Sequence, residues 1–141
     1  MKTKILLAGL FAAASLTGFA QSKSAAPVPA AVKTAFEHQY PGTKAKWEPE
    51  DGNCEASFIN KGVKTSAVYN KAGKLVETET AISGDAFPKA AKDYIARKKL
   101  GVVTETAKII KADGTVSYEA EIKKTDYLFD EKGNFLRTQK D

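Results

Sequence analysis

The 141-residue sequence has very few of the residues on which most enzyme and metal sites depend. His38 is its only histidine, Cys54 its only cysteine and Trp47 its only tryptophan. A nucleophilic site needs a base beside the nucleophile, and a zinc site needs three or four ligands. Because His38 falls on a polar part of its predicted helix and Cys54 alternates with apolar residues, we expect neither catalytic residues nor a metal site.

Cofactor motifs are missing as well. Neither GxGxxG nor GxxxxGK[ST] occurs, so nucleotide binding has no support. Glu48, Glu50, Asp51 and Glu55 flank one predicted hairpin without the order of an EF-hand loop, and a solvated turn explains them better. Paired carboxylates could serve a glycosidase, but the chain is short for such an enzyme. We therefore predict no cofactor.

A single cysteine also limits how the fold can be stabilised. No internal disulfide can form, so a hydrophobic core must hold the structure together. We expect Cys54 to lie in that core as a small apolar residue. The alternative is an intermolecular disulfide.

The first 20 residues have the layout of a secretory signal peptide. Lys2 and Lys4 precede an apolar run over residues 5–16, and Gly18-Phe19-Ala20 offers small residues for cleavage. The run is shorter than the roughly 20 residues that span a bilayer, which disfavours the alternative of a membrane anchor. We predict cleavage after Ala20, export to the periplasm and no membrane insertion of the mature chain.

The positive charge of the chain is spread out. The formal net charge is +5, and removal of Lys2 and Lys4 leaves 20 basic residues against 17 acidic ones, about +3. A nucleic-acid binder would cluster lysine and arginine with aromatic residues between them. Here lysines alternate with acids and threonines, and Arg97-Lys98-Lys99 falls where it complements a helix dipole. We expect no nucleic-acid partner.

The mature chain resembles itself at an offset of about 60 residues, which indicates an internal duplication. Val68-Tyr69-Asn70 matches Leu128-Phe129-Asp130, and Gly73 matches Gly133. We predict a flexible N-terminal segment over 21–27, a first repeat over 28–81, a connector over 82–87 and a second repeat over 88–141.

Each predicted repeat begins with a helix led by Pro29 or Pro88. Apolar residues at helical spacing and alternating strand patterns follow. Strands are expected near 45–47, 54–58, 64–69, 74–80, 103–111, 116–123, 125–129 and 135–139. We predict an α+β fold of two tandem repeats, each one helix followed by a four-stranded antiparallel meander, with the helices packed on one sheet face.

The alternation also predicts a polar sheet face opposite the helices. Val116, Tyr118, Ala120 and Ile122 alternate with polar residues, so one face should be buried and the other wet. This polar face either binds a protein or is merely solvated. Its residues are Glu55, Ser57, Ser117, Glu119, Glu121 and Lys123. Trp47 belongs either to the core or to an exposed binding anchor.

The order of these motifs resembles the PepSY-like family, small exported bacterial proteins that include tandem domains likened to the β-lactamase inhibitor protein. The matching residues are Pro29, Tyr40-Pro41-Gly42 and the segments 69–75 and 129–135. The second repeat departs from the pattern, because its helix ends in Lys99-Leu100-Gly101. The resemblance implies an envelope location and a role linked to inhibition or chaperoning of peptidases, with no catalytic residues to carry over.

These observations predict a non-enzymatic exported binding module. It would bind an envelope protein or peptide through its open sheet face, as an inhibitor or a chaperone-like binder, and would act as a monomer. The alternative is a periplasmic small-ligand or metal-ion binding protein. A small hydrolase is disfavoured, because the sequence supplies no nucleophile–base pair.

Overall fold

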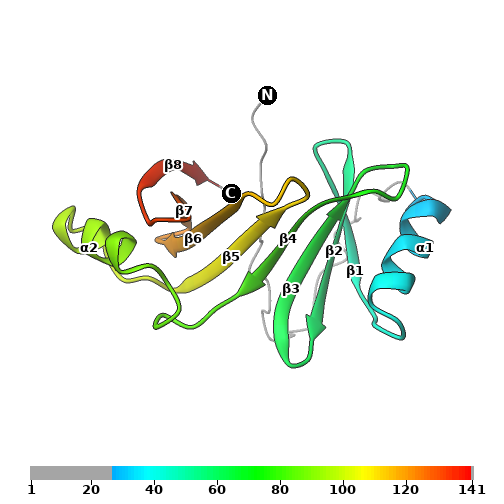
Figure 1. The fold of residues 1–141 in the computed structure, drawn as a ribbon, viewed down its shortest axis with the longest axis horizontal. Helices are drawn as coiled ribbons and strands as arrows, with labels where there is room; N and C mark the ends of the chain where they lie inside the picture. Colours follow the sequence, from blue (N-terminus) through cyan, green and yellow to red (C-terminus); the bar gives the residue numbers. More distant parts are fainter. Residues whose placement is uncertain (1–26, 141) are drawn as a thin grey trace, which may run out of the picture.

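The computed structural model describes residues 27–140 and contains two short helices (Figure 1). Helix α1 spans Ala30–Gln39 and helix α2 spans Lys89–Arg97. Each begins directly after a proline, whose fixed φ suits the start of a helix. The signal peptide predicted over 1–20 lies outside the described residues, as does all but the last residue of the segment predicted over 21–27.

Glycine ends both helices. The Tyr40 N–H donates a hydrogen bond of 2.7 Å to the Phe36 carbonyl, and Gly42 then turns the chain with φ +69°. After α2, the Leu100 N–H bonds to the Ile95 carbonyl at 3.2 Å, and Gly101 has φ +133°. These left-handed backbone angles suit glycine, because it has no Cβ.

Eight antiparallel strands form a meander in which each strand pairs with the next one along the chain. The sheet order is therefore β1 to β8 without a crossover. The strands are β1 Lys46–Glu50, β2 Asn53–Asn60, β3 Val63–Tyr69, β4 Leu75–Ala81, β5 Glu105–Lys111, β6 Val116–Ile122, β7 Thr125–Asp130 and β8 Phe135–Lys140.

The pairing of β4 with β5 joins all eight strands into one sheet. Glu77 lies opposite Lys111, and Ala81 lies opposite Ala107. The predicted α+β fold of two tandem repeats, each with its own four-stranded meander, is therefore wrong. The described chain is mostly β, with two helices on one continuous sheet. An unpaired edge strand would expose a row of N–H and C=O groups, and β4 and β5 pair these groups with each other.

Helix α1 packs on one face of the sheet, which we call the outer face. Val32 and Phe36 are buried there in a cluster with Ala56, Phe58, Ala67 and Tyr69. Trp47 of β1 packs against this cluster, with its ring 5.3 Å from that of Phe36 in an edge-to-face arrangement. Trp47 thus contributes to the core, one of the two roles expected for it.

Helix α2 covers the other half of the same outer face. Ala91 and Ile95 are buried against Ala120, Ile122 and Phe129. Serial strand partners, Ala67 with Thr78, Thr78 with Ile110 and Ile110 with Val116, place both clusters on one side of the sheet. Figure 1 shows the two helices at opposite ends of the molecule, with the sheet between them.

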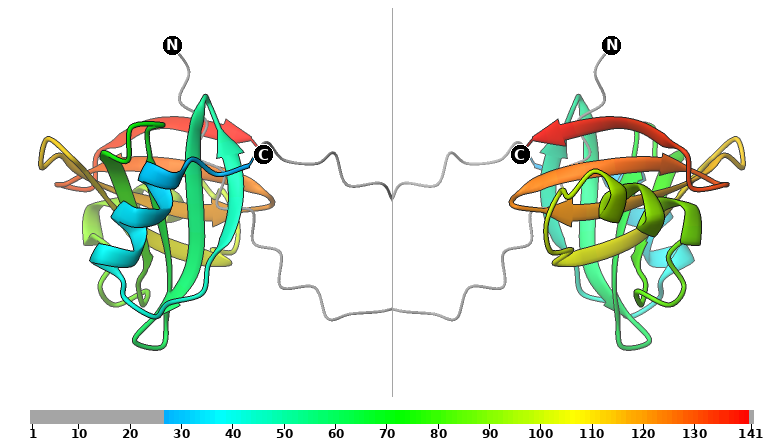
Figure 2. Two further views of the ribbon diagram at one scale, coloured as in Figure 1. Left: turned by 90° about the vertical axis from the view of Figure 1, so that its right-hand side faces the viewer. Right: turned by 90° about the vertical axis from the view of Figure 1, so that its left-hand side faces the viewer.

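The opposite face, which we call the inner face, is also largely buried. The sheet is strongly twisted and curved, and strands at its two ends run in very different directions (Figure 2). Val68, Ile109 and Leu128 are nearly inaccessible on this face. The expectation that this face is wet is wrong at Glu55, Ser117 and Glu119, which are 3%, 8% and 5% exposed.

Within residues 27–140, no helix is both long enough and apolar enough to cross a membrane.

Candidate functional site

The inner face carries a concentration of acidic side chains. Directly paired residues in a sheet point to the same side, so the strand registers identify the members of this face. Glu48 pairs with Glu55, Glu105 with Glu121, and Glu121 with Asp126. We call the following residues the acidic face: Glu48, Glu50, Glu55, Glu77, Glu79, Glu105, Glu119, Glu121 and Asp126. Asp130 also pairs on this side, with Ser117, but its carboxylate bonds to the turn after β7 and is not counted.

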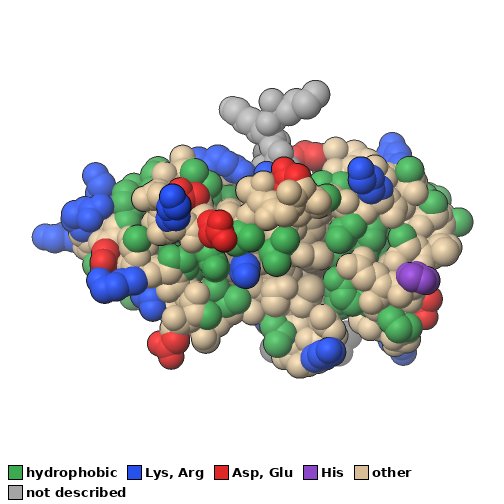
Figure 3. Space-filling model, in the orientation of Figure 1, with side chains coloured by type: hydrophobic (Ala, Val, Ile, Leu, Met, Phe, Trp, Pro, Cys, Tyr) green, Lys and Arg blue, Asp and Glu red, His purple; other side chains and the backbone are tan. Residues whose placement is uncertain are grey.

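The acidic face is opposite in charge to the chain as a whole, which has a formal net charge of +5. The acidic face holds nine of the 17 acidic residues, although the sequence is basic overall. The basic residues on the same side of the sheet are Lys46, Lys64, Lys111 and Arg137. Figure 3, in the orientation of Figure 1, shows lysine and arginine side chains gathered at the end of the molecule that carries α2. The inner side of the sheet is therefore net acidic, although the chain is basic overall.

The residues predicted for the binding face are mostly brought together. Glu55, Ser57, Ser117, Glu119 and Glu121 all lie on the inner face. Ser57 is exposed, Glu121 is half-buried and the other three are buried. Lys123 is not part of the face, because β6 ends at Ile122 and Lys123 takes φ +52° in the following turn.

The predicted binding face left out six members of the acidic face: Glu48, Glu50, Glu77, Glu79, Glu105 and Asp126. Glu77 and Glu79 are separated by one residue on β4, and both are at most 3% exposed. Asp126 pairs with Glu121 and is 3% exposed. The alternation of Glu77, Thr78 and Glu79 was a usable signal, because it places both glutamates on one side of a strand.

Glu79 lies near the middle of the inner face. Its side chain is 1% exposed, and neither carboxyl oxygen has a hydrogen-bond partner among the described residues. Its neighbours across the sheet are Ser66 on β3 and Ile109 on β5. Burial, and then the nearby charges of Glu119, Glu55, Glu77 and Asp126, raise the pKa of Glu79 well above the usual glutamate range.

Glu55 and Glu77 show the same effect. Burial raises the pKa of Glu55 to about 7, although a hydrogen bond with Ser66 opposes this shift. Burial also raises the pKa of Glu77, with Lys111 and Arg137 acting in the opposite direction. These carboxyl groups thus hold protons at a pH at which an exposed glutamate has lost its proton.

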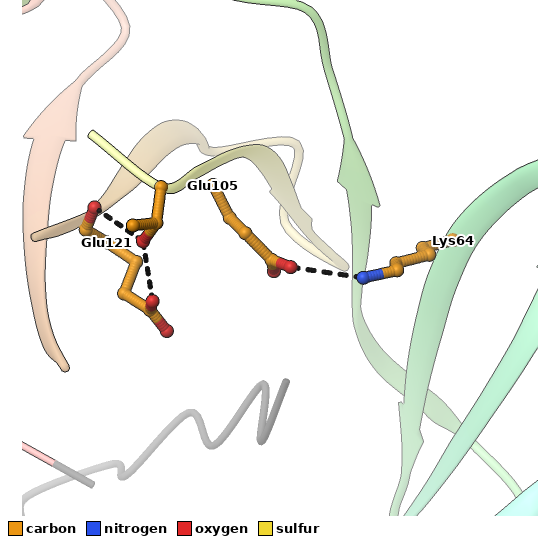
Figure 4. Close-up of polar contacts among 4 residues, drawn as sticks. Lys64, Glu105 and Glu121 are labelled. Carbon is orange, nitrogen blue, oxygen red and sulfur yellow. Dashed lines mark hydrogen bonds and ion pairs between the residues drawn. The ribbon is translucent and has the colours of Figure 1, made fainter. Parts of the chain in front are cut away.

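The rim of the acidic face is better supplied with partners (Figure 4). Lys64 Nζ lies 3.0 Å from Glu105 Oε1, and Lys46 Nζ lies 2.7 Å from Glu48 Oε1. The Thr104 hydroxyl donates a hydrogen bond of 2.6 Å to Glu121 Oε1. All of these rim groups are partly or fully exposed. Beside them, Glu105, Glu119 and Glu121 line a cavity of about 10 Å³, which is room for about one water molecule.

The acidic face does not have the geometry of a metal site. Among residues 27–140, no group of three or more His, Cys, Asp or Glu side chains could hold a metal ion. The carboxylates come from several strands across the sheet. A wide carboxylate surface can attract cationic groups without coordinating an ion.

The residues considered for nucleophilic chemistry lie in different places. His38 is exposed on α1 and borders a surface depression with Gly73. Cys54 is half-buried under the α1 cluster and borders a separate hollow of about 220 Å³, with Pro29, Trp47 and Pro49.

Comparison with known proteins identifies the fold. No protein-family model and no curated protein sequence matches the chain. A predicted periplasmic protein from Bacteroides eggerthii matches with a TM-score of 0.66 and 22% identity, over 81% of this chain and 89% of that one. A DUF2874 family protein from Bacteroides uniformis matches with a TM-score of 0.65 and 21% identity, over 79% and 88%.

A BLIP-like protein from Bacteroides fragilis matches with a TM-score of 0.60 and 19% identity, over 82% of this chain and 88% of that one. At these identities the likeness shows the fold alone. The chain therefore has the fold of the DUF2874 and BLIP-like structures, and the PepSY-like resemblance rests on its sequence motifs. The expected periplasmic location agrees with the description of the Bacteroides eggerthii protein.

Proposed function

We propose that the protein is a non-enzymatic periplasmic binding module that holds an envelope protein or peptide against its inner face. The observation that carries this proposal is the collection of carboxylates on one face of a basic chain. Removing an ionised carboxylate from water costs several kcal/mol. Ile109 and Leu128 occupy equally buried positions on the same face, so folding alone gives no reason to place glutamate there.

The fold and the N-terminal sequence support the same proposal. The segment 1–20 has the pattern of an export signal, and one structure with this fold is described as a predicted periplasmic protein. Another is described as BLIP-like. An inhibitor or a chaperone-like binder would be a more specific form of the proposed function, since both hold a second polypeptide against a rigid surface.

The alternative of a small-ligand carrier has weaker support. Pockets for small molecules generally enclose about 300–1,000 Å³. The hollow beside Trp47 and Cys54 holds about 220 Å³, and the cavity on the inner face holds about 10 Å³. The depression beside His38 and Gly73 is larger, about 670 Å³, but it is an open surface depression that would not enclose a ligand. The exposed rim of the inner face, which includes Lys46, Glu48, Lys64 and Glu105, suits a polypeptide segment better than an enclosed small molecule.

Site-specific photo-crosslinking in the native bacterium tests the proposed function. Ser57 is exposed on the inner face, and Ile110 is exposed on the outer face. A photoreactive phenylalanine at position 57 should give one discrete crosslinked species, and the same probe at position 110 should not. Crosslinking only from position 110, or from neither position, would contradict the proposal.

A further inference from the structure

The acidic face also indicates the chemistry of its partner. We propose that the carboxylates around Glu79 form a receptor for a lysine or arginine side chain of the bound polypeptide. This inference rests on the proposed function, because it assigns a ligand to the same face. It names one occupant, a cationic side chain, and Glu79 as the buried group that it meets.

Glu79 is a buried acid without a hydrogen-bond partner among the described residues. Its side chain is 1% exposed, and buried polar groups in folded proteins are normally paired. Four further carboxylates act on it electrostatically: Glu55, Glu77, Glu119 and Asp126. A cation placed among them would supply the missing partner through charge-assisted hydrogen bonds.

The carboxylates around Glu79 lie below the rim of the inner face, and Val68, Ile109 and Leu128 beside them are covered by the protein's own chain. Lysine and arginine carry a charged head on a long apolar stem, so the head can reach a carboxylate below the rim. A metal ion has no such stem and would need convergent ligands, which residues 27–140 do not supply. A long cationic side chain therefore suits carboxylates that lie below the rim better than a metal ion does.

The rim indicates how a cationic side chain would enter. Glu105 and Glu121 are half-buried and border the small cavity together with the buried Glu119. Lys64 already reaches over the rim to Glu105 at 3.0 Å, as Figure 4 shows. Since this ion pair is exposed, it contributes little to stability. A cation of the partner would replace Lys64 at the rim, and it would reach the deeper carboxylates once the side chains around the cavity of about 10 Å³ move apart.

Calorimetric titration of the mature protein with a defined peptide tests this inference. The probe is acetylated, amidated tetra-arginine, and its control is the uncharged tetra-citrulline peptide. Tetra-arginine should bind at pH 7, Glu79→Gln should weaken this binding at least tenfold, and tetra-citrulline should not bind. The exposed acid Glu131 provides a control of equal charge, because Glu131→Gln should leave the affinity unchanged.

A second readout separates a binding role of Glu79 from a structural one. Binding of the cation should ionise Glu79, so the measured enthalpy should depend on the ionisation enthalpy of the buffer. Glu79→Gln should reduce this dependence, with the remainder due to Glu55 and Glu77, and the variant should still fold, because glutamine resembles a protonated glutamate. Should Glu79→Gln unfold, Glu119→Gln is measured in its place, with the same tenfold loss expected.

Three results would overturn the inference: no binding of tetra-arginine, equal binding of tetra-citrulline, or unchanged affinity in the folded variant. The photo-crosslink from position 57 then shows which proposal has failed. If position 57 gives the crosslink although tetra-arginine fails these tests, the inner face binds its partner by other chemistry. If position 57 gives no crosslink, the proposed function fails as well.

Discussion

Glu55, Glu77 and Glu79 occupy positions at which an apolar side chain would cost less free energy. Each is at most 3% exposed, and burial disfavours the charged form of a carboxyl group. Their raised pKa values are the consequence. Single residues on the inner face thus lower stability at neutral pH and keep acid groups ready for an incoming cation.

The effect of a buried carboxyl group on the free energy of unfolding can be measured at Glu55. Its pKa is about 7 in the folded protein and near the usual value of 4.5 when unfolded. The folded state therefore binds more protons between these values, so the contribution of Glu55 to stability is present below pH 4.5 and lost as the pH rises through 7. We expect Glu55→Gln to raise the free energy of unfolding by ~1–3 kcal/mol at pH 8 and to change it little at pH 5.

Urea unfolding at the two pH values checks this expectation. Glu131→Gln is the matched control, because Glu131 is exposed in a turn, and it should have no comparable effect. An equal change in stability for Glu55→Gln at pH 5 and pH 8 would show that the Glu55 carboxyl group does not hold its proton in the folded state.

The sequence placed individual residues on the correct face more reliably than it predicted their burial. Alternation put Glu55, Ser117 and Glu119 opposite the helices, as observed. Alternation assigns the two faces of a strand, but it contains no information on how far the sheet curves. The same residues would be wet on a flat sheet and are buried on this one.

At the scale of elements, the turns after β3 and β7 are closed in the same way, by the side chain of their first residue. Asn70 Oδ1 accepts hydrogen bonds from the Ala72 and Lys74 N–H groups, each at 3.0 Å. Asp130 Oδ1 does the same for the Lys132 and Asn134 N–H groups, at 2.9 and 2.8 Å. These bonds explain why asparagine or aspartate opens both turns.

The glycine in the first of these turns has a second role. Gly73 has φ +82°, and a Cβ added there would lie 2.5 Å from the backbone oxygen of Ala31 in α1. Gly114 has nearly the same φ, +84°, but a Cβ there would meet no atom within 4 Å. Substitutions at the two glycines therefore distinguish the cost of backbone strain, which both share, from the cost of contact with α1, which only position 73 has.

We expect Gly73→Ala to cost more stability than Gly114→Ala. Both substitutions strain the backbone by about 1 kcal/mol, and overpacking against α1 should add ~1–3 kcal/mol at position 73 only. Thermal or urea unfolding of the two variants measures the difference. Equal losses would mean that the turn does not support α1 as closely as the structure shows.

The helices and strands were predictable where their end signals are strong. Pro29, Pro88 and the glycines after each helix indicated the two helices, and Asp51-Gly52 indicated the first hairpin. The end of β6 was missed because its turn consists of Lys123 and Lys124, both with positive φ. Lysine rarely adopts this backbone conformation, so the sequence contains no signal for the turn.

At the scale of the molecule, the arrangement of the strands escaped prediction. The turn signals in the sequence predicted a meander within each half of the chain. They do not predict that β4 pairs with β5, because no short turn connects these two strands and α2 lies between them in the chain. The resulting continuous sheet gathers Glu55 of β2, Glu79 of β4 and Glu119 of β6 on one face. The acidic face is therefore a property of the complete sheet, and neither half of the chain contains it alone.

The most direct test of this account is the titration of the Glu79 carboxyl carbon by NMR, with the signal assigned through Glu79→Gln. We predict that Glu79 stays protonated at pH 7 in the free mature protein, because burial and neighbouring carboxylates raise its pKa. Addition of tetra-arginine should shift the signal to its ionised position. A Glu79 that titrates near the ordinary value of 4.5 in the free protein, or that stays protonated at pH 7 when the peptide is bound, would contradict the account.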